Sequence, residues 1–180
     1  MRSIACRELR VSAGSSFRRR TCSVVLWCSG SSKPTATMSS AGVTVAVTIR
    51  ATQDALLNVQ QVREAVRKVW ELESGPAARV EVVLMDEEEH SQLHGEFLHD
   101  PSATDVMAFP YGEEDCFGEL LVNVEMAARV AAEHGQTAEQ ECTLYVVHGC
   151  LHLLGYDDHT DADRAEMRAA EVRVMQALGV

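Results

Sequence analysis

The sequence predicts a single α+β domain, in which a four-stranded mixed sheet is packed with about five helices. Short segments rich in β-branched and alternating apolar residues indicate strands. Longer segments with apolar residues at steps of three and four indicate helices with one core-facing stripe. The predicted order is strand, helix, strand, helix, strand, strand, helix, helix, helix. The predicted strands are residues 43–49, 79–85, 104–110 and 117–123.

Strands and helices alternate in the first half of the predicted domain. After the first strand, Asp54 is placed to cap a helix from Ala55 to about Leu72. Gly75 and Pro76 then break the chain before the second strand. Asp86 is placed to cap a short acidic helix that extends to roughly Leu98.

The second half begins with two strands that are joined by a short acidic loop, as in a hairpin. A helix from Glu125 to His134 should end at Gly135. Thr137 and Gln140 then form a capping-box pattern at the start of the next helix.

The last predicted helix runs from Ala162 to Leu178, with Thr160 or Asp161 as its cap. The predicted domain therefore spans residues 43–180.

The first 42 residues differ from the rest of the chain in composition. Residues 1–37 hold seven basic residues and one acidic residue, a net charge of +6, so the remaining residues carry −17 of the total of −11. Such a segment is typical of an organelle transit peptide or of an upstream start codon read in error, and we expect it to be disordered. The acidic remainder is a poor non-specific binder of nucleic acid, because phosphate contacts need Lys and Arg.

Cysteine spacing and hydropathy exclude two other classes of protein. The six cysteines form no CxxC pair, so a cysteine zinc ribbon is not expected and reduced thiols are. The longest apolar run near the start, residues 24–28, is too short to span a membrane. We expect a cytoplasmic protein, or an organellar one if residues 1–42 are a transit peptide in a eukaryotic host.

Residues 148–159 contain three histidines, and they carry the strongest functional signal. His148 and His152 are four residues apart, which places both rings on one helix face. Gly155 is suited to end that helix, and the turn after it can bring His159 beside the other two. Three imidazoles with one open coordination position are the pattern of a catalytic zinc site, and we expect one Zn²⁺ ion there.

The segment His148-Gly-Cys-Leu-His-Leu-Leu-Gly-Tyr-Asp, followed by histidine, resembles the signature HGxLHLxGYDH of the YbeY family, the metal-dependent endoribonucleases of ribosomal RNA maturation. Two further segments resemble family elements: Thr104 to Pro110 is similar to the TDVLSFP element, and Phe117 to Asn123 to the strand after it. The resemblance covers residues from about 43 to 180.

The chain departs from the family pattern at two places. It has Asp157-Asp158-His159 where the family has one Asp before the third His, so either His159 remains the third ligand, as we expect, or Asp158 occupies that position. Family members also carry an arginine six residues before the Thr of the TDV element, where this chain has Leu98. Nearby His94 and His99 are expected to be exposed residues at a helix end.

The resemblance implies a single-strand-specific endoribonuclease that acts in ribosomal RNA processing and ribosome biogenesis, with ribosomal RNA and ribosomal particles or proteins as partners. Zinc-bound water would hydrolyse the phosphodiester, because zinc lowers the pKa of bound water to ~7. A zinc peptidase is one alternative, although Gly149 replaces the glutamate base of HExxH, so Glu119 or Asp157 would have to supply a carboxylate. The other alternative is a non-catalytic ribosome assembly factor with a structural metal.

Asp157 has two possible roles beside the histidines. It can accept a hydrogen bond from an imidazole N–H and so fix the ring, or it can serve as a turn residue after Tyr156.

Overall fold

The computed structural model describes residues 42–52, 58–112 and 116–180. These residues form four strands and five helices, which confirms the predicted α+β fold. Almost all of the predicted N-terminal extension lies outside the described residues. The elements are β1 (Thr44–Ile49), α1 (Val59–Leu72), β2 (Arg79–Met85), α2 (Glu87–Leu98), β3 (Val106–Pro110), β4 (Gly118–Asn123), α3 (Val124–His134), α4 (Ala138–Leu153) and α5 (Asp161–Leu178).

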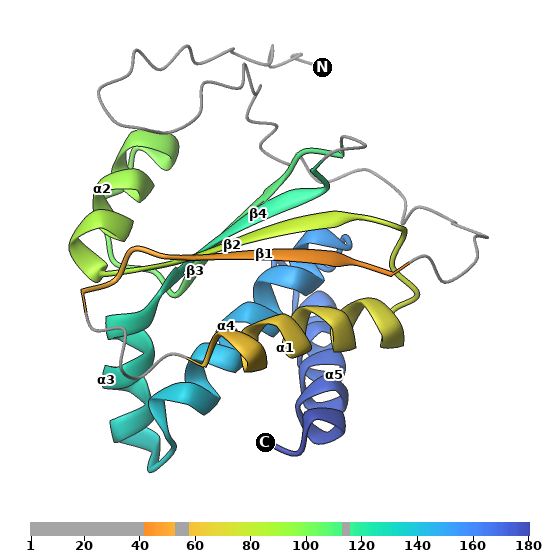
Figure 1. The fold of residues 1–180 in the computed structure, drawn as a ribbon. Coiled ribbons are helices and arrows are strands. Elements are labelled where there is room, and N and C mark those ends of the chain that lie inside the picture. Colours follow the sequence, from red (N-terminus) through yellow and green to blue (C-terminus); the bar gives the residue numbers. More distant parts are fainter. Residues whose placement is uncertain (1–41, 53–57, 113–115) are drawn as a thin grey trace.

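The four strands form one mixed sheet in the order β1-β2-β4-β3 (Figure 1). β1 pairs with β2 and β2 with β4 in parallel, whereas β3 and β4 are antiparallel, as the short connection between them predicts. Val82 on β2 and Ala108 on β3 both lie opposite Leu120, so β4 is flanked on both sides.

The sheet separates two unequal layers of helices. Figure 1 shows α2 alone on one side, and α1, α3, α4 and α5 on the other. The larger core joins alternate residues of the inner strands to α1, α4 and α5; Val82, Leu120 and Leu151 are fully buried in it. Since successive strand residues face opposite sides, Leu121 packs in the smaller cluster on the α2 side.

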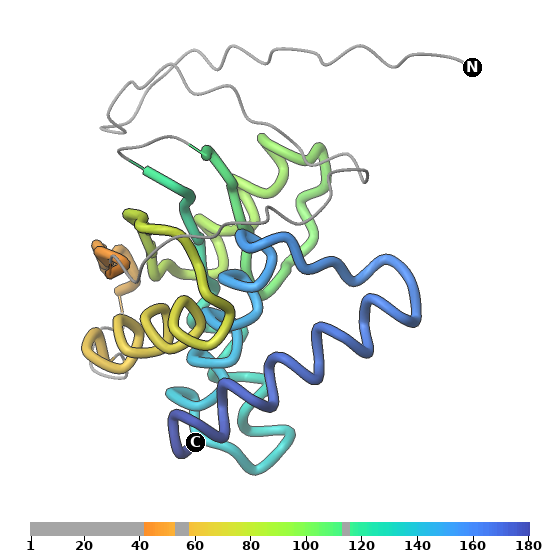
Figure 2. Tube along the Cα trace, turned by 90° about the vertical axis from the view of Figure 1, so that its right-hand side faces the viewer, coloured from red at the N-terminus to blue at the C-terminus, as the bar shows by residue number. Residues whose placement is uncertain are grey.

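Helix α4 is the centre of the larger layer, with packing contacts to α1, α3, α5, β3 and β4. Figure 2 shows α5 crossing the side of the molecule that faces the viewer. α4 lies close against the sheet at Gly149, where an added Cβ atom would lie 2.9 Å from Leu120 Cδ2 and 3.0 Å from Val106 Cγ2. A glycine next to His148 therefore lets the helix lie directly on the strands.

Capping residues set where the helices begin. α1 begins at Val59, because the Asn58 side chain accepts a hydrogen bond from the Gln61 N–H. Asn58 has an extended backbone, so α1 does not continue to earlier residues; the predicted start at Ala55 and its cap Asp54 lie outside the described residues. At the start of α4, Thr137 and Gln140 form the predicted capping box.

Two further caps bear on the predictions. Thr160 caps α5 through the Asp163 N–H, which settles the choice between Thr160 and Asp161. Asp86 occupies the N-cap position of α2 as predicted, but its carboxylate accepts the Thr52 N–H instead of a helix N–H.

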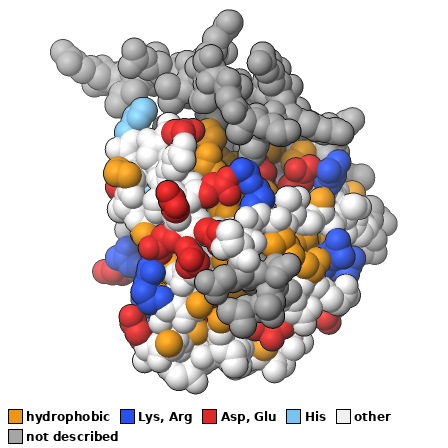
Figure 3. Space-filling model, turned by 60° about the vertical axis from the view of Figure 1, so that its left-hand side comes forward, with side chains coloured by type: hydrophobic (Ala, Val, Ile, Leu, Met, Phe, Trp, Pro, Cys, Tyr) orange, Lys and Arg blue, Asp and Glu red, His pale blue; other side chains and the backbone are white. Residues whose placement is uncertain are grey.

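Acidic side chains gather on one face of the molecule, close to a few Lys and Arg side chains (Figure 3). Two ion pairs involve the first turn of α2, where Glu87 pairs with Arg129 and Glu89 pairs with Arg50. The Arg129 guanidinium holds the pKa of Glu87 below its ordinary value. Among the described helices, none combines the length and apolarity that crossing a bilayer requires.

Candidate metal centre

His148 and His152 lie one turn apart on α4, and their rings meet edge to face at a centroid distance of 4.6 Å. Their Nε2 atoms are 3.1 Å apart. The predicted placement of the two rings on one helix face is therefore observed, and both Nε2 atoms point at a common position.

The other ring nitrogen of each histidine has a partner that accepts hydrogen bonds. His148 Nδ1 lies 2.7 Å from Glu171 Oε1, and His152 Nδ1 lies 3.0 Å from the Tyr156 carbonyl oxygen. A carbonyl or an ionised carboxylate only accepts, so both Nδ1 atoms carry the proton. When both rings are neutral with the proton on Nδ1, both Nε2 atoms can donate a lone pair to one cation held between them.

Burial and charge move the two histidine pKa values in opposite directions. Burial lowers the pKa of His148, but the hydrogen bond and negative charge of Glu171 outweigh burial, so its pKa is raised. Burial lowers the pKa of His152, and the neighbouring His148 lowers it further. The lowered pKa favours the neutral, metal-binding form of His152, whereas the raised pKa of His148 makes metal binding through its ring more sensitive to pH.

A carboxylate completes the cluster. His148, His152 and Asp158 each offer a ligand atom, and these atoms all lie within 4.8 Å of one another. His159 does not belong to this group: its side chain is 72% exposed, and it groups with Asp157 and Asp158 instead. The expectation that His159 is the third ligand stays a prediction, and Asp158 is the alternative that lies beside the two rings.

The donor set fits a zinc ion. Two nitrogen ligands at ~2.0–2.1 Å from a tetrahedral zinc ion lie roughly 3.3 Å apart, close to the 3.1 Å between the two Nε2 atoms. Imidazole and carboxylate are both zinc ligands, and a site with three protein ligands leaves one position open.

The turn that carries Asp158 is fixed by hydrogen bonds from the helix after it. Arg164 donates to the carbonyl oxygens of Asp158 and His159, at 2.8 and 3.0 Å. Asp157 accepts the Asp158 N–H within this turn, and the same carboxylate oxygen lies 3.6 Å from His159 Nε2, so both expected roles of Asp157 stay open. His152 is held by the carbonyl of Tyr156 and not by Asp157.

Tyr156 is anchored in turn by a more distant part of the chain. Its hydroxyl donates to Glu73 Oε2 at 2.6 Å, at the C-terminal end of α1, and Arg173 of α5 pairs with the same carboxylate. The backbone carbonyl that holds His152 is therefore tied to both α1 and α5.

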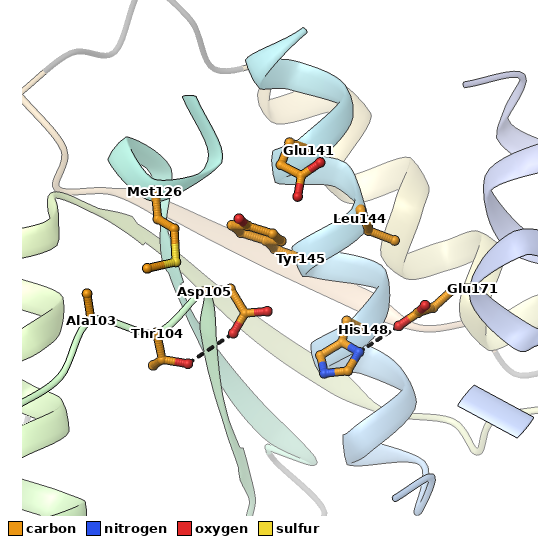
Figure 4. Close-up of a pocket in the computed structure, with 9 residues that line it drawn as sticks. All are labelled: Ala103, Thr104, Asp105, Met126, Glu141, Leu144, Tyr145, His148 and Glu171. Atoms are coloured by element: carbon orange, nitrogen blue, oxygen red, sulfur yellow. Dashed lines mark hydrogen bonds and ion pairs between the residues drawn. The ribbon is translucent and has the colours of Figure 1, made fainter. Parts of the chain in front are cut away.

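A cavity of about 500 Å³ opens beside His148 (Figure 4). The loop before β3 contributes Asp105, which accepts hydrogen bonds from the Thr104 hydroxyl and the Val106 N–H. Buried Asn123 holds this loop by donating to the Thr104 carbonyl oxygen at 3.1 Å. The lining residues are Ala103, Thr104, Asp105, Met126, Glu141, Leu144, Tyr145, His148 and Glu171, none of which is Lys or Arg.

Several other residues singled out from the sequence lie away from this centre. Glu119 accepts a hydrogen bond from Tyr111 and alternates with Leu120, so it faces the α2 side of the sheet and cannot serve as a base at α4. Leu98 is exposed at the end of α2. His99 is exposed as predicted, but His94 is buried, contrary to the expectation.

The sequence reading missed Glu171, Glu141 and Tyr145. Glu171 lies 23 residues after His148, so no short-range spacing links them; only the helical stripe of the last helix could have indicated that it faces inward. Glu141 and Tyr145 precede His148 by seven and three residues on α4. At these offsets both side chains lie on the same helix face as His148, so the sequence alone could have indicated them.

Two imidazoles and a carboxylate beside an open cavity, on a helix that lies against a mixed sheet, define a candidate metal-dependent hydrolase. A closed structural site would instead have four protein ligands. The sequence profile of the family described as "Endoribonuclease YbeY" matches residues 46–179, and the chain belongs to this family.

Named relatives and one solved structure agree with this assignment. A protein of Desulforamulus reducens named "Endoribonuclease YbeY" is 35% identical over 136 residues, covering 68% of this chain and 88% of that protein. A protein of Stutzerimonas stutzeri with the same name is 40% identical over 102 residues, covering 53% and 64%. The solution structure of TM1509 from Thermotoga maritima matches with a TM-score of 0.57 and 29% identity, covering 75% of this chain and 89% of that one.

Proposed function

We propose that this protein is a zinc-dependent endoribonuclease that cleaves single-stranded RNA during ribosomal RNA maturation. Membership of the YbeY family and the name shared by its relatives support an RNA-cleaving hydrolase. One observation carries the metal dependence: the Nε2 atoms of His148 and His152 face each other at 3.1 Å beside an open cavity.

We propose that His148, His152 and Asp158 are the three protein ligands of the ion. Asp158 has this role because its carboxylate lies within the same cluster as the two rings. His159 is the competing third ligand; for it to bind, the turn would have to move its exposed ring towards α4. Either choice gives three protein ligands and an open position.

Bound zinc activates water and polarises a phosphoryl oxygen, and it brings positive charge to a cavity whose lining has no Lys or Arg. The residues of the chain supply orientation. Glu171 and the Tyr156 carbonyl hold the proton at Nδ1 of each imidazole, so that both Nε2 atoms stay available. Asn123 holds the loop that carries Asp105, and thereby fixes the wall opposite His148.

The overall charge favours RNA that is presented by a partner over free RNA. An acidic domain gains little from phosphate contacts, so ribosomal RNA within ribosomal particles is the proposed substrate. Leu98 stands where family members carry an arginine, so this chain lacks one guanidinium contact to phosphate there. We place the reaction in the cytoplasm, or in an organelle if the first 42 residues are a transit peptide.

The experiment compares cleavage of end-labelled single-stranded RNA, double-stranded RNA and ribosomal particles by the wild type and by His152→Ala. The proposal predicts cleavage of the single-stranded RNA and the particles, loss of cleavage with a chelator or in the variant, and recovery when zinc is returned to the wild type. Metal-dependent binding to particles without any cleavage would refute the nuclease and favour the assembly factor.

The third ligand is tested separately with Asp158→Ala and His159→Ala. Loss of zinc affinity and cleavage in Asp158→Ala, with both kept in His159→Ala, is the expected result. The reverse pattern would assign the third position to His159.

A further inference from the structure

Each metal-binding histidine donates a hydrogen bond to an acceptor outside α4, and the two acceptors differ in kind. His152 is held by a backbone carbonyl, whereas His148 is held by the side chain of Glu171 on α5. Glu171 is therefore the partner that a single side-chain substitution removes.

We propose that Glu171 is a positioning residue that fixes the proton of His148 on Nδ1 and so sets the affinity of the metal centre. The inference rests on the proposed metal site and adds a residue to it. The distance of 2.7 Å is that of a charge-assisted hydrogen bond. Both side chains are largely shielded, with 22% of His148 and 17% of Glu171 exposed, so water competes poorly for either partner.

The position of Glu171 in the fold makes this role specific. It is ten residues after the start of α5, and the turn from Gly155 to Thr160 joins that helix to α4. The two helices that flank the turn thus each contribute to the centre: α4 supplies the two rings, and α5 supplies the carboxylate that orients one of them. In Figure 4, Glu171 reaches His148 from α5 at the edge of the cavity.

Carboxylates that orient a metal-binding histidine raise its basicity and fix its tautomer. Without Glu171, the proton of a neutral His148 is free to sit on Nε2, the atom that faces His152, and such a ring cannot bind a metal through that atom. Glu171→Ala should therefore weaken zinc binding by roughly 10- to 100-fold. Glu171→Gln keeps an oxygen that can accept from Nδ1 and should fall between the wild type and Glu171→Ala.

The test measures zinc affinity by competition with a chromophoric chelator for the wild type, Glu171→Ala and Glu171→Gln. Glu166→Ala is the matched control, since it removes the same charge from an exposed position of the same helix. Circular dichroism of the metal-free proteins verifies that each variant is folded. The proposal predicts the order wild type and Glu166→Ala, then Glu171→Gln, then Glu171→Ala.

A second measurement does not depend on metal or activity. ¹⁵N NMR of the metal-free chain near pH 8 should show the proton of neutral His148 on Nδ1 in the wild type and Glu171→Gln, and a shift towards Nε2 in Glu171→Ala. Equal zinc affinities for Glu171→Ala and Glu166→Ala, or a wild-type proton on Nε2, would overturn the inference. A wild type that binds zinc but cleaves no RNA would instead overturn the proposed function and leave this role of Glu171 standing.

Discussion

Replacing Gly149 by alanine tests whether the motif glycine is there to let α4 lie close to the sheet. A Cβ atom at this position would lie 2.9 Å from Leu120 Cδ2 and 3.0 Å from Val106 Cγ2. Leu120 is fully buried, so it has little room to move away. Such overpacking costs about 1–3 kcal/mol, whereas alanine gains ~1 kcal/mol over glycine inside a helix. Gly149→Ala should therefore lower the free energy of unfolding by about 0–2 kcal/mol.

Gly95 in α2 provides the matched control, because a Cβ atom there meets nothing closer than Pro101 Cβ at 3.5 Å, an ordinary contact. Gly95→Ala should gain the helix propensity alone and raise the free energy of unfolding by up to ~1 kcal/mol. The propensity gain is common to both variants, so the difference between them measures the overpacking directly and should be about 1–3 kcal/mol.

The assay is urea unfolding of the metal-free proteins followed by circular dichroism, together with zinc affinity. Gly149→Ala should also weaken zinc binding, because moving α4 displaces His148 relative to the turn after the helix; Gly95→Ala should leave affinity unchanged. Equal stability of the two variants would refute the close-packing role of Gly149.

Two further predictions concern a buried charge and a helix cap. Burial raises the pKa of Glu119 despite its hydrogen bond from Tyr111. The protonated carboxyl therefore favours the folded state at low pH, and this contribution to the free energy of unfolding is lost as the pH rises through the folded pKa. Glu119→Gln should thus be more stable than the wild type near pH 7 and equally stable near pH 4 in urea titrations; a difference that does not change with pH would contradict this reasoning. Thr137→Ala removes the capping box with Gln140 and should cost about 1 kcal/mol without changing zinc affinity, since the histidines lie at the other end of α4. A parallel fall in affinity, measured by chelator competition, would contradict the local effect of the cap.

Much of the fold could be predicted because its signals are local. The capping box of Thr137 and Gln140 and the i,i+4 spacing of His148 and His152 are patterns within one turn of helix, and the structure has both. The start of α1 was placed too early, because Asp54 and Asn58 are both residues that favour an N-cap and the sequence alone gives no reason to prefer the second.

The contacts around the metal centre were harder to foresee, because they join distant segments. Glu171 meets His148 only once α5 has packed against α4. The neighbours Asp158 and His159 differ by one position in a turn, and the backbone conformation decides which side chain faces α4. The burial of His94 likewise depends on how α2 packs on the sheet.

The central claim is that His148 and His152 hold a metal ion. Calorimetric titration of the metal-free chain with zinc, for the wild type and for His148→Ala, tests it most directly. We expect one ion per wild-type chain, proton release on binding, and loss of tight binding in the variant. A wild type that takes up no zinc, or a variant that binds it as tightly as the wild type does, would contradict the assignment of the centre to these two histidines.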